Sequence, residues 1–412
     1  MPLFHNHVDA RVEAAWILRQ PLLCLNLAPR PPFSTSGGLL RKLALLATAL
    51  CLGSCSRNGA DGDAIVIGLA GPFSQPRGVA MRRAAELAVR EVNARGGVRG
   101  RPLALRVLDD SGRPAVAIRI AHELAHDPAV LAVIGHLTSG TSLAAGRVYG
   151  EDRRPVVMIS PSASSPDLSG LNPYVFRVCP TDLSHGAQLA RYARQELGTR
   201  RAGLIYIDDD YGRGLRLSFA AEFRRLGGEV VSEDPVLGTT ASVEPYLARL
   251  RRRGGVDVLM LATERGGAEV ALREMARLGI SWPVLGGDAL TGIEAAGPLA
   301  EGVRLSSAYL ADRPGERNAV FVAAYARAYE HQRPDHRGAA SYDIVHLLAR
   351  LLEDAGVDRV ALRDRLARVG RDLPAYEGVT GTIAFDGRGD VPAKPVVIGV
   401  VQGGRIVTVG SP

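Results

Sequence analysis

Two short loops rich in serine and threonine follow apolar runs that have the composition of buried strands. The run at 131–137 leads into TSGTS at 138–142, and the run at 155–159 leads into SPSASS at 160–165. The carboxyl ends of parallel strands meet at one edge of a sheet, where loop hydroxyls and the N–H groups of the next helix suit a carboxylate. We therefore expect a site for a small ligand with a carboxylate, and such a site needs no nucleophile or base.

A literal HExxH sequence at His122–His126 is the sharpest indication of an enzyme in the chain. On a helix it would place both imidazoles on one face for zinc, with Glu123 as the base. A third ligand should follow on the same or a neighbouring helix. Instead, Asp127 and Pro128 end this helix and the chain enters an apolar strand directly. We therefore expect no metal and no cofactor.

Other enzyme patterns are missing or incomplete. No GxGxxG follows the first expected strand and no GxxxxGK[ST] occurs, so nucleotide phosphates lack their usual loop. The serines at 138–165 belong to no GxSxG turn, and His136 precedes them in the chain. The aspartates at 208–210 more simply cap a following helix than hold a metal. These observations favour a binding protein with no catalytic residues.

Length and composition favour a protein with more than one lobe. The 412 residues are 46% hydrophobic, which is enough for sizeable cores divided between two or more domains. The formal net charge is +7, but the arginines are scattered over expected helices together with glutamates. A nucleic-acid partner requires a basic stripe or cluster. The charge therefore predicts solvated helix faces, and we expect no nucleic acid as a partner.

The N-terminal residues are typical of a secretory signal. Residues 41–55 combine a basic start, an apolar run too short to span a bilayer and small residues before Cys55. The segment LGSC at 52–55 resembles the bacterial lipobox, in which the cysteine is lipid-modified and begins the mature protein. An ordinary cleaved signal with an incidental cysteine is the alternative. We expect a leader with a lipoprotein-type signal at 1–55, and an extracytoplasmic protein anchored to the membrane through lipid on Cys55.

The rest of the chain alternates between strands and helices. Apolar runs of strand length occur at 64–71 and 103–110, and a second series includes 201–208 and 257–263. Repeated strand–helix units predict parallel sheets with helices on both faces. The tail at 381–410 contains three further short strands with a Gly-Gly turn. The sequence therefore predicts an α/β protein.

Three stretches carry a family resemblance. They are VIGHLTSGTSLAAGRVYGEDRRPVVMISPSASSPDLSG at 133–170, the pattern NxxGGxxGxxLxLxxxDD at 93–110, and VFRVCPTDLSHGAQLARYA at 175–193. Together they resemble the leucine/isoleucine/valine-binding proteins of bacterial ABC transporters, which have the type I periplasmic-binding fold. The resemblance implies two doubly wound parallel-sheet lobes joined by a three-crossing hinge.

The same resemblance implies the extent of each lobe. Lobe 1 would contain residues 64–180 and 311–386, and lobe 2 would contain residues 181–310 and 387–410. Hinges of this kind let two rigid lobes close on a ligand.

Carried over residue by residue, the resemblance implies an amino-acid site between the lobes. Ser139 and Ser164 match positions that hold the ligand carboxylate, with Thr141 and the main chain of Ser162 close by. Asp288 of lobe 2 matches the acidic residue that neutralises the ligand ammonium. A buried cation without such a partner would cost several kcal/mol.

Three further positions concern the rest of the ligand. Tyr211 matches a family aromatic that covers the ligand from lobe 2. Thr263 stands where relatives often place a tyrosine, which puts one ammonium contact in doubt. Arg77 stands where an aromatic residue often lines the side-chain pocket. It either points to solvent or points inward, where it would favour a ligand with a second acidic group.

The resemblance predicts the function as well as the fold. The protein would be the extracytoplasmic solute-binding component of an ABC transporter, binding an amino acid of branched-chain type or a related compound and presenting it to a membrane permease. A ligand-sensing or regulatory module of the same fold, for amides or amino acids, is the alternative. We expect no enzymatic activity.

Overall fold

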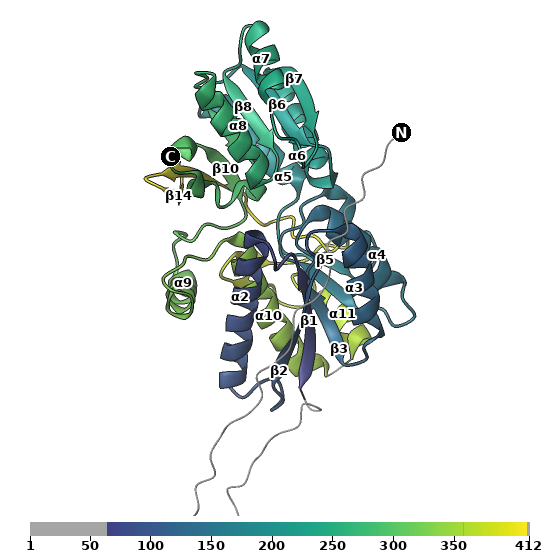
Figure 1. Ribbon diagram of the computed structural model, residues 1–412. Helices are drawn as coiled ribbons and strands as arrows, with labels where there is room; N and C mark the ends of the chain where they lie inside the picture. Colours follow the sequence, from purple (N-terminus) through teal and green to yellow (C-terminus); the bar gives the residue numbers. More distant parts are fainter. Residues whose placement is uncertain (1–63, 357, 410–412) are drawn as a thin grey trace, which may run out of the picture. The chain divides into compact units, whose positions relative to one another are not determined.

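The computed structural model describes residues 64–356 and 358–409, which form two α/β lobes (Figure 1). The expected leader at 1–55, with Cys55, lies outside the described residues. Among the helices that the structure describes, none combines the length and apolar character needed to cross a bilayer.

Lobe 1 is built on a five-stranded sheet whose strands all run parallel. The strands are β1 (Ile65–Gly71), β2 (Leu103–Asp109), β3 (Val130–Ile134), β4 (Val157–Ser160) and β5 (Val175–Arg177). Their spatial order is β2-β1-β3-β4-β5, so the winding reverses between β1 and β3. Ligands of open α/β sheets bind at such a switch point, beyond the carboxyl ends of the strands.

Helices cover both faces of this sheet (Figure 1). On one face, α2 (Pro76–Ala94) and α10 (His336–Ala355) share a hydrophobic core with Leu69 of β1. On the other face, α3 (Pro114–His126) and α4 (Ser139–Glu151) share a core with the adjacent Ala70. Successive strand residues point to opposite faces, so β1 is buried on both sides, as its continuous apolar sequence predicts.

Lobe 2 is built on a seven-stranded sheet in the order β14-β13-β10-β9-β8-β6-β7. Its strands are β6 (Arg201–Ile207), β7 (Glu229–Val236), β8 (Val258–Ala262), β9 (Val284–Gly286), β10 (Arg304–Ser307), β13 (Val397–Gln402) and β14 (Arg405–Thr408). Strands β6, β7, β8, β9 and β10 run parallel to one another. Strands β13 and β14 are antiparallel and lie at one edge of the sheet. The β13–β14 hairpin turns at Gly403 and Gly404, both with positive φ, which two-residue hairpin loops require.

Helices also cover both faces of the second sheet. α5 (Asp182–Gln195) and α6 (Asp210–Arg225) share a core with Met260 of β8. α7 (Glu244–Arg252) and α8 (Arg265–Arg277) share the opposite core with Leu259 and Leu261. The alternation along β8 therefore divides the lobe into two cores.

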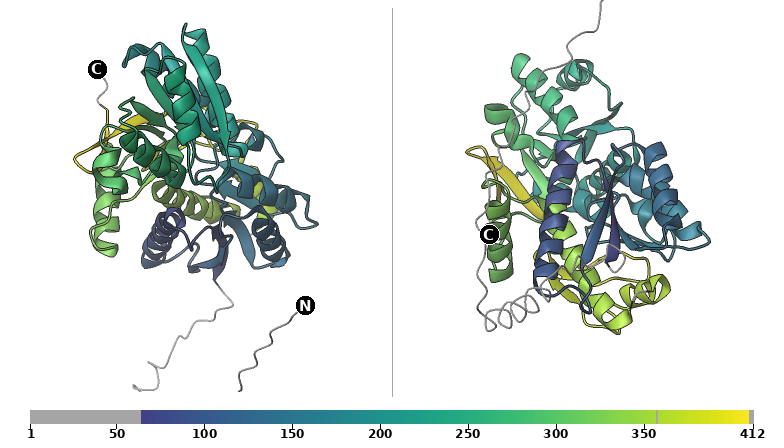
Figure 2. Two further views of the ribbon diagram at one scale, coloured as in Figure 1. Left: turned by 45° about the horizontal axis from the view of Figure 1, so that its top comes forward. Right: turned by 60° about the horizontal axis from the view of Figure 1, so that its bottom comes forward.

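The chain passes between the two sheets three times: after β5, after β10 and before β13 (Figure 2). The three-crossing arrangement predicted from the sequence is thus confirmed, while the residue boundaries of the lobes stay predictions. The strand expected at 381–386 is present as Gly381–Ile383 and pairs with Tyr376–Gly378 in a separate two-stranded sheet. The remaining elements are α9 (Glu316–Ala328), α11 (Arg359–Leu366), β11 (Tyr376–Gly378), β12 (Gly381–Ile383) and the 3₁₀ helices η1 (Pro166–Leu168), η2 (Asp288–Leu290) and η3 (Ile293–Ala300).

Candidate functional site

A cavity of about 460 Å³ lies between loops of the two lobes. It is lined from lobe 1 by the starts of α2 and α10 and by residues that follow β2, β3 and β4, and from lobe 2 by residues that end or follow β6 and that follow β7, β8 and β9. Thr263 is buried at the end of β8 and is not among the lining residues. The other seven predicted ligand contacts all line this cavity: Arg77, Ser139, Thr141, Ser162, Ser164, Tyr211 and Asp288.

The hydroxyl loops form one wall of the cavity because α4 begins there. Thr138 caps this helix, its side chain accepting a hydrogen bond from the Thr141 N–H at 3.4 Å. Ser139 joins the two loops, since its Oγ accepts from the Ser165 N–H at 3.2 Å. Ser139 and Gly140, the first residues of α4, line the cavity. Helix N-terminal N–H groups together with hydroxyls suit a carboxylate.

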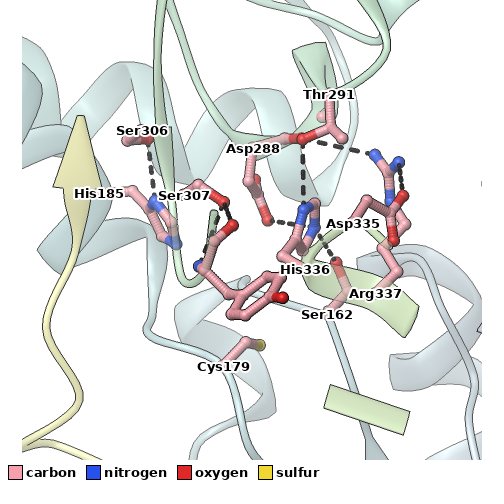
Figure 3. Close-up of polar contacts among 12 residues, drawn as sticks. Ser162, Cys179, His185, Asp288, Thr291, Ser306, Ser307, Asp335, His336 and Arg337 are labelled. Atoms are coloured by element: carbon pink, nitrogen blue, oxygen red, sulfur yellow. Dashed lines mark hydrogen bonds and ion pairs between the residues drawn. The ribbon is translucent and has the colours of Figure 1, made fainter. Parts of the chain in front are cut away.

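Asp288 supplies a carboxylate from the second lobe, where it begins η2 directly after β9. Its side chain is 5% exposed, and its Oδ2 lies 3.5 Å from Nε2 of His336 (Figure 3). Arg337 donates to the Asp288 main-chain oxygen at 3.4 Å rather than to the carboxylate. Tyr211 fixes the same loop, because its hydroxyl oxygen accepts from the Ala289 N–H at 3.3 Å.

His336, at the start of α10, connects the two walls of the cavity (Figure 3). Burial above all, and then Arg337, lowers the pKa of its imidazole to about 3, so the ring is neutral near pH 7. A neutral ring carries one N–H. Placed on Nε2, it donates toward Asp288 and Ser162, while Nδ1 accepts from the Thr291 hydroxyl at 3.2 Å. His336 therefore orients Asp288 without neutralising it.

Asp182 is a second carboxyl group that sequence reasoning missed. It begins α5, is fully buried, and among the described residues neither carboxyl oxygen has a hydrogen-bond partner. Its N–H donates to the Ser164 carbonyl oxygen at 2.8 Å, which places it beside the second hydroxyl loop. Burial first, and then the nearby Asp288, raises the pKa of Asp182 well above its usual range. Asp182 does not itself line the cavity, so Asp288 is the carboxylate of the two that a ligand can reach.

Residues 64–405 match the family model described as periplasmic binding protein. The chain belongs to the periplasmic binding protein family. The predicted family and the type I fold are therefore confirmed.

The chain is similar along most of its length to two solved structures and to a relative compared by sequence. An ABC transporter substrate-binding protein from Desulfitobacterium hafniense, in complex with Leu, is 34% identical with a TM-score of 0.73, covering 84% of this chain and 100% of that one. The branched-chain amino acid transporter substrate binding protein LivJ from Streptococcus pneumoniae, in complex with isoleucine, is 25% identical with a TM-score of 0.76 over the same shares. The Leu/Ile/Val-binding protein homolog 1 of Brucella suis is 27% identical over 334 residues, which are 79% of this chain and 87% of the relative.

The HExxH segment of the binding protein lies on α3, away from the cavity-lining residues. The imidazole rings of His122 and His126 stack with centroids 6.0 Å apart. Glu123 accepts a hydrogen bond from Arg106 at 2.6 Å, so its carboxylate is already paired. Among residues 64–409 as described, no three histidine, cysteine, aspartate or glutamate side chains are grouped to hold a metal.

The buried imidazole of His336 predicts a loss of stability at acid pH. Its pKa is about 3 in the folded protein, against 6.5 for an ordinary histidine. Between these two pH values the unfolded chain binds a proton at His336 and the folded chain does not. The free energy of unfolding contributed by this difference is fully present above pH 6.5 and is lost as the pH falls toward 3. We expect this group to lower the free energy of unfolding by about 1.4 kcal/mol between pH 7.5 and 5.5.

Urea unfolding at both pH values measures this effect. The His336→Gln variant should lose that part of the pH dependence, whereas His122→Gln, on an exposed position of α3, should keep it. Equal pH dependence in the wild type and in His336→Gln would contradict the prediction.

Proposed function

We propose that this protein is the extracytoplasmic solute-binding component of an ABC transporter, and that it binds an amino acid between its lobes. One observation carries the proposal. A single cavity has hydroxyls and the start of α4 on one side and the buried, un-neutralised Asp288 on the other. These features complement the negative and positive ends of one zwitterion.

The relatives support the choice of ligand class. Two solved relatives carry Leu and isoleucine, so amino acids of branched-chain type or related compounds are the first candidates. Ser139, Thr141, Ser162 and Ser164 would receive the ligand carboxylate, and Asp288 would receive its ammonium. Tyr211 would cover the ligand from lobe 2.

Closure of the lobes would couple binding to transport. A ligand held by both walls has contacts with two lobes only when they are closed, so it shifts the population toward the closed form. The closed form would then dock on a membrane permease. Lipid on Cys55 would keep the protein close to that permease, and catalysis has no part in this mechanism.

A thermal-shift screen tests the proposal. Purified protein is heated with each of the twenty amino acids, with small amides and with simple carboxylates. A ligand present at a hundred times its Kd stabilises the folded state by about 2.7 kcal/mol, which raises the Tm. We expect amino acids to give the largest shifts. If no amino acid raises the Tm, or if purified protein chemically converts the bound compound, the proposal is wrong.

A further inference from the structure

The cavity wall beyond the two anchors is charged rather than apolar. Arg77, Asp209, Asp210, Glu264 and Arg337 all line it, and Arg337 is already paired with Asp335. Its aliphatic lining is limited to four residues: Pro114, Leu137, Ile207 and Ala289. A purely aliphatic ligand side chain seated against these charges would displace their water and return no hydrogen bond. The wall therefore suits a ligand with a polar end.

An ion pair between the lobes forms the centre of this wall. Arg77 follows β1 in lobe 1, Glu264 follows β8 in lobe 2, and Nη1 of the arginine lies 2.5 Å from Oε1 of the glutamate. Gln75 holds the guanidinium in place, because its Oε1 accepts from Arg77 Nε at 2.8 Å while its own amide donates to the Ser111 carbonyl oxygen. Arg77 is thus directed inward, which resolves the two orientations that the sequence left open.

The ion pair retains unpaired N–H groups on Arg77 and an unpaired carboxylate oxygen on Glu264 for a ligand. Within the described part of the chain, neither Nη2 of Arg77 nor Oε2 of Glu264 has a hydrogen bond, and both side chains are partly exposed at the cavity. The pair is neutral as a whole. A group that accepts at one atom and donates at the neighbouring atom would complete both.

We propose that the Arg77–Glu264 pair makes this cleft prefer, among amino acids, those that end in a neutral amide or ureido group, such as glutamine or citrulline. This inference rests on the proposed function. The amide oxygen accepts from Arg77 Nη2, and the amide N–H donates to Glu264 Oε2. Both contacts exist only when the lobes are closed, since the pair has one member in each lobe.

Other polar ends match this wall less well. A second carboxylate would meet Asp209, Asp210 and Glu264, and like charges in a partly buried site repel. A second ammonium would meet Arg77, and the carboxylates of this wall already accept hydrogen bonds, Asp209 from the Gly212 N–H, Asp210 from Arg213 and Glu264 from Arg77. The amide is the group whose donor and acceptor match the two atoms left on the pair.

Calorimetric titration of the purified protein tests the preference. The ligands are glutamine, citrulline, leucine, isoleucine and glutamate. We expect glutamine or citrulline to bind at least tenfold more tightly than leucine. In Arg77→Met, this ratio should fall at least tenfold, and a Tm equal to that of the wild type without ligand would show that the fold is intact.

A matched control comes from the neighbouring loop. Arg265 is paired with Glu269 on α8 and does not line this cavity, so Arg265→Met should leave the ratio unchanged. Leucine binding as tightly as glutamine would overturn the inference, and so would an unchanged ratio in Arg77→Met. Both results would leave the proposed function standing, because that function fails if no amino acid binds or if the bound compound is chemically converted.

Discussion

Replacing Asp288 with asparagine should weaken amino-acid binding by at least a hundredfold. The substitution keeps the shape of the side chain and removes the negative charge that faces the ligand ammonium. Asp288 is buried and its neighbour His336 is neutral, while the nearby Arg337 donates to the Asp288 main-chain oxygen and not to its carboxylate. Removing one partner of a buried, hydrogen-bonded charge pair costs about 2–5 kcal/mol, and about 3 kcal/mol corresponds to a hundredfold change in Kd.

Calorimetric titration of the wild type and of Asp288→Asn with the best amino acid measures this effect. Asp208→Asn is the matched control, because Asp208 is paired with Arg213 at 2.9 Å and does not line the cavity. An analogue without the amino group should bind both proteins almost equally. A Kd for Asp288→Asn within threefold of the wild-type value, in a variant with unchanged Tm, would contradict the ammonium assignment.

Features that depend on short stretches of chain could be predicted from the sequence. The hydroxyl loops lie at one sheet edge because they follow neighbouring parallel strands, and that follows from composition and chain order. Pro114 marks the first residue of α3, and Gly403 with Gly404 mark the final hairpin. In each case a local rule determines the local structure.

Features that depend on distant residues could not be predicted in this way. His336 bonds to Ser162, 174 positions away, and its sequence context is only that of a residue near the start of an expected helix. Asp182 has the same local pattern as an ordinary residue in the first turn of a helix. Its significance comes from complete burial without partners, which only the folded chain reveals.

The family resemblance predicted the location of some site residues better than that of others. It placed Asp288 and Tyr211 at the cavity, because the loops after β6 and β9 reach it. It also proposed Thr263, but this side chain is short and buried behind the end of β8. Arg77 could not be decided from the sequence, since its direction depends on Gln75 and on Glu264 in the other lobe.

Replacing Arg177 with methionine should lower the free energy of unfolding by about 3–5 kcal/mol. The Arg177 side chain is 1% exposed at the end of β5, and its Nε lies 2.7 Å from Oδ1 of Asp390. Its Nη1 also donates to the carbonyl oxygens of Ala163 and Ser165, at 3.2 and 2.7 Å. Methionine fills similar space but leaves the Asp390 carboxylate without its cation, and the two carbonyl oxygens keep only the Cys179 thiol and the Leu168 N–H as donors.

Urea unfolding measures the loss, with Arg191→Met as the control. Arg191 pairs with Glu222 on the more exposed surface of lobe 2, where loss of an ion pair costs at most about 1 kcal/mol. The two carbonyl oxygens held by Arg177 flank Ser164, so amino-acid affinity in Arg177→Met should fall together with stability. If the destabilised variant binds the amino acid with wild-type affinity, the second hydroxyl loop keeps its position without Arg177. A decrease of less than about 1 kcal/mol in the free energy of unfolding would contradict the stabilising role of the buried ion pair.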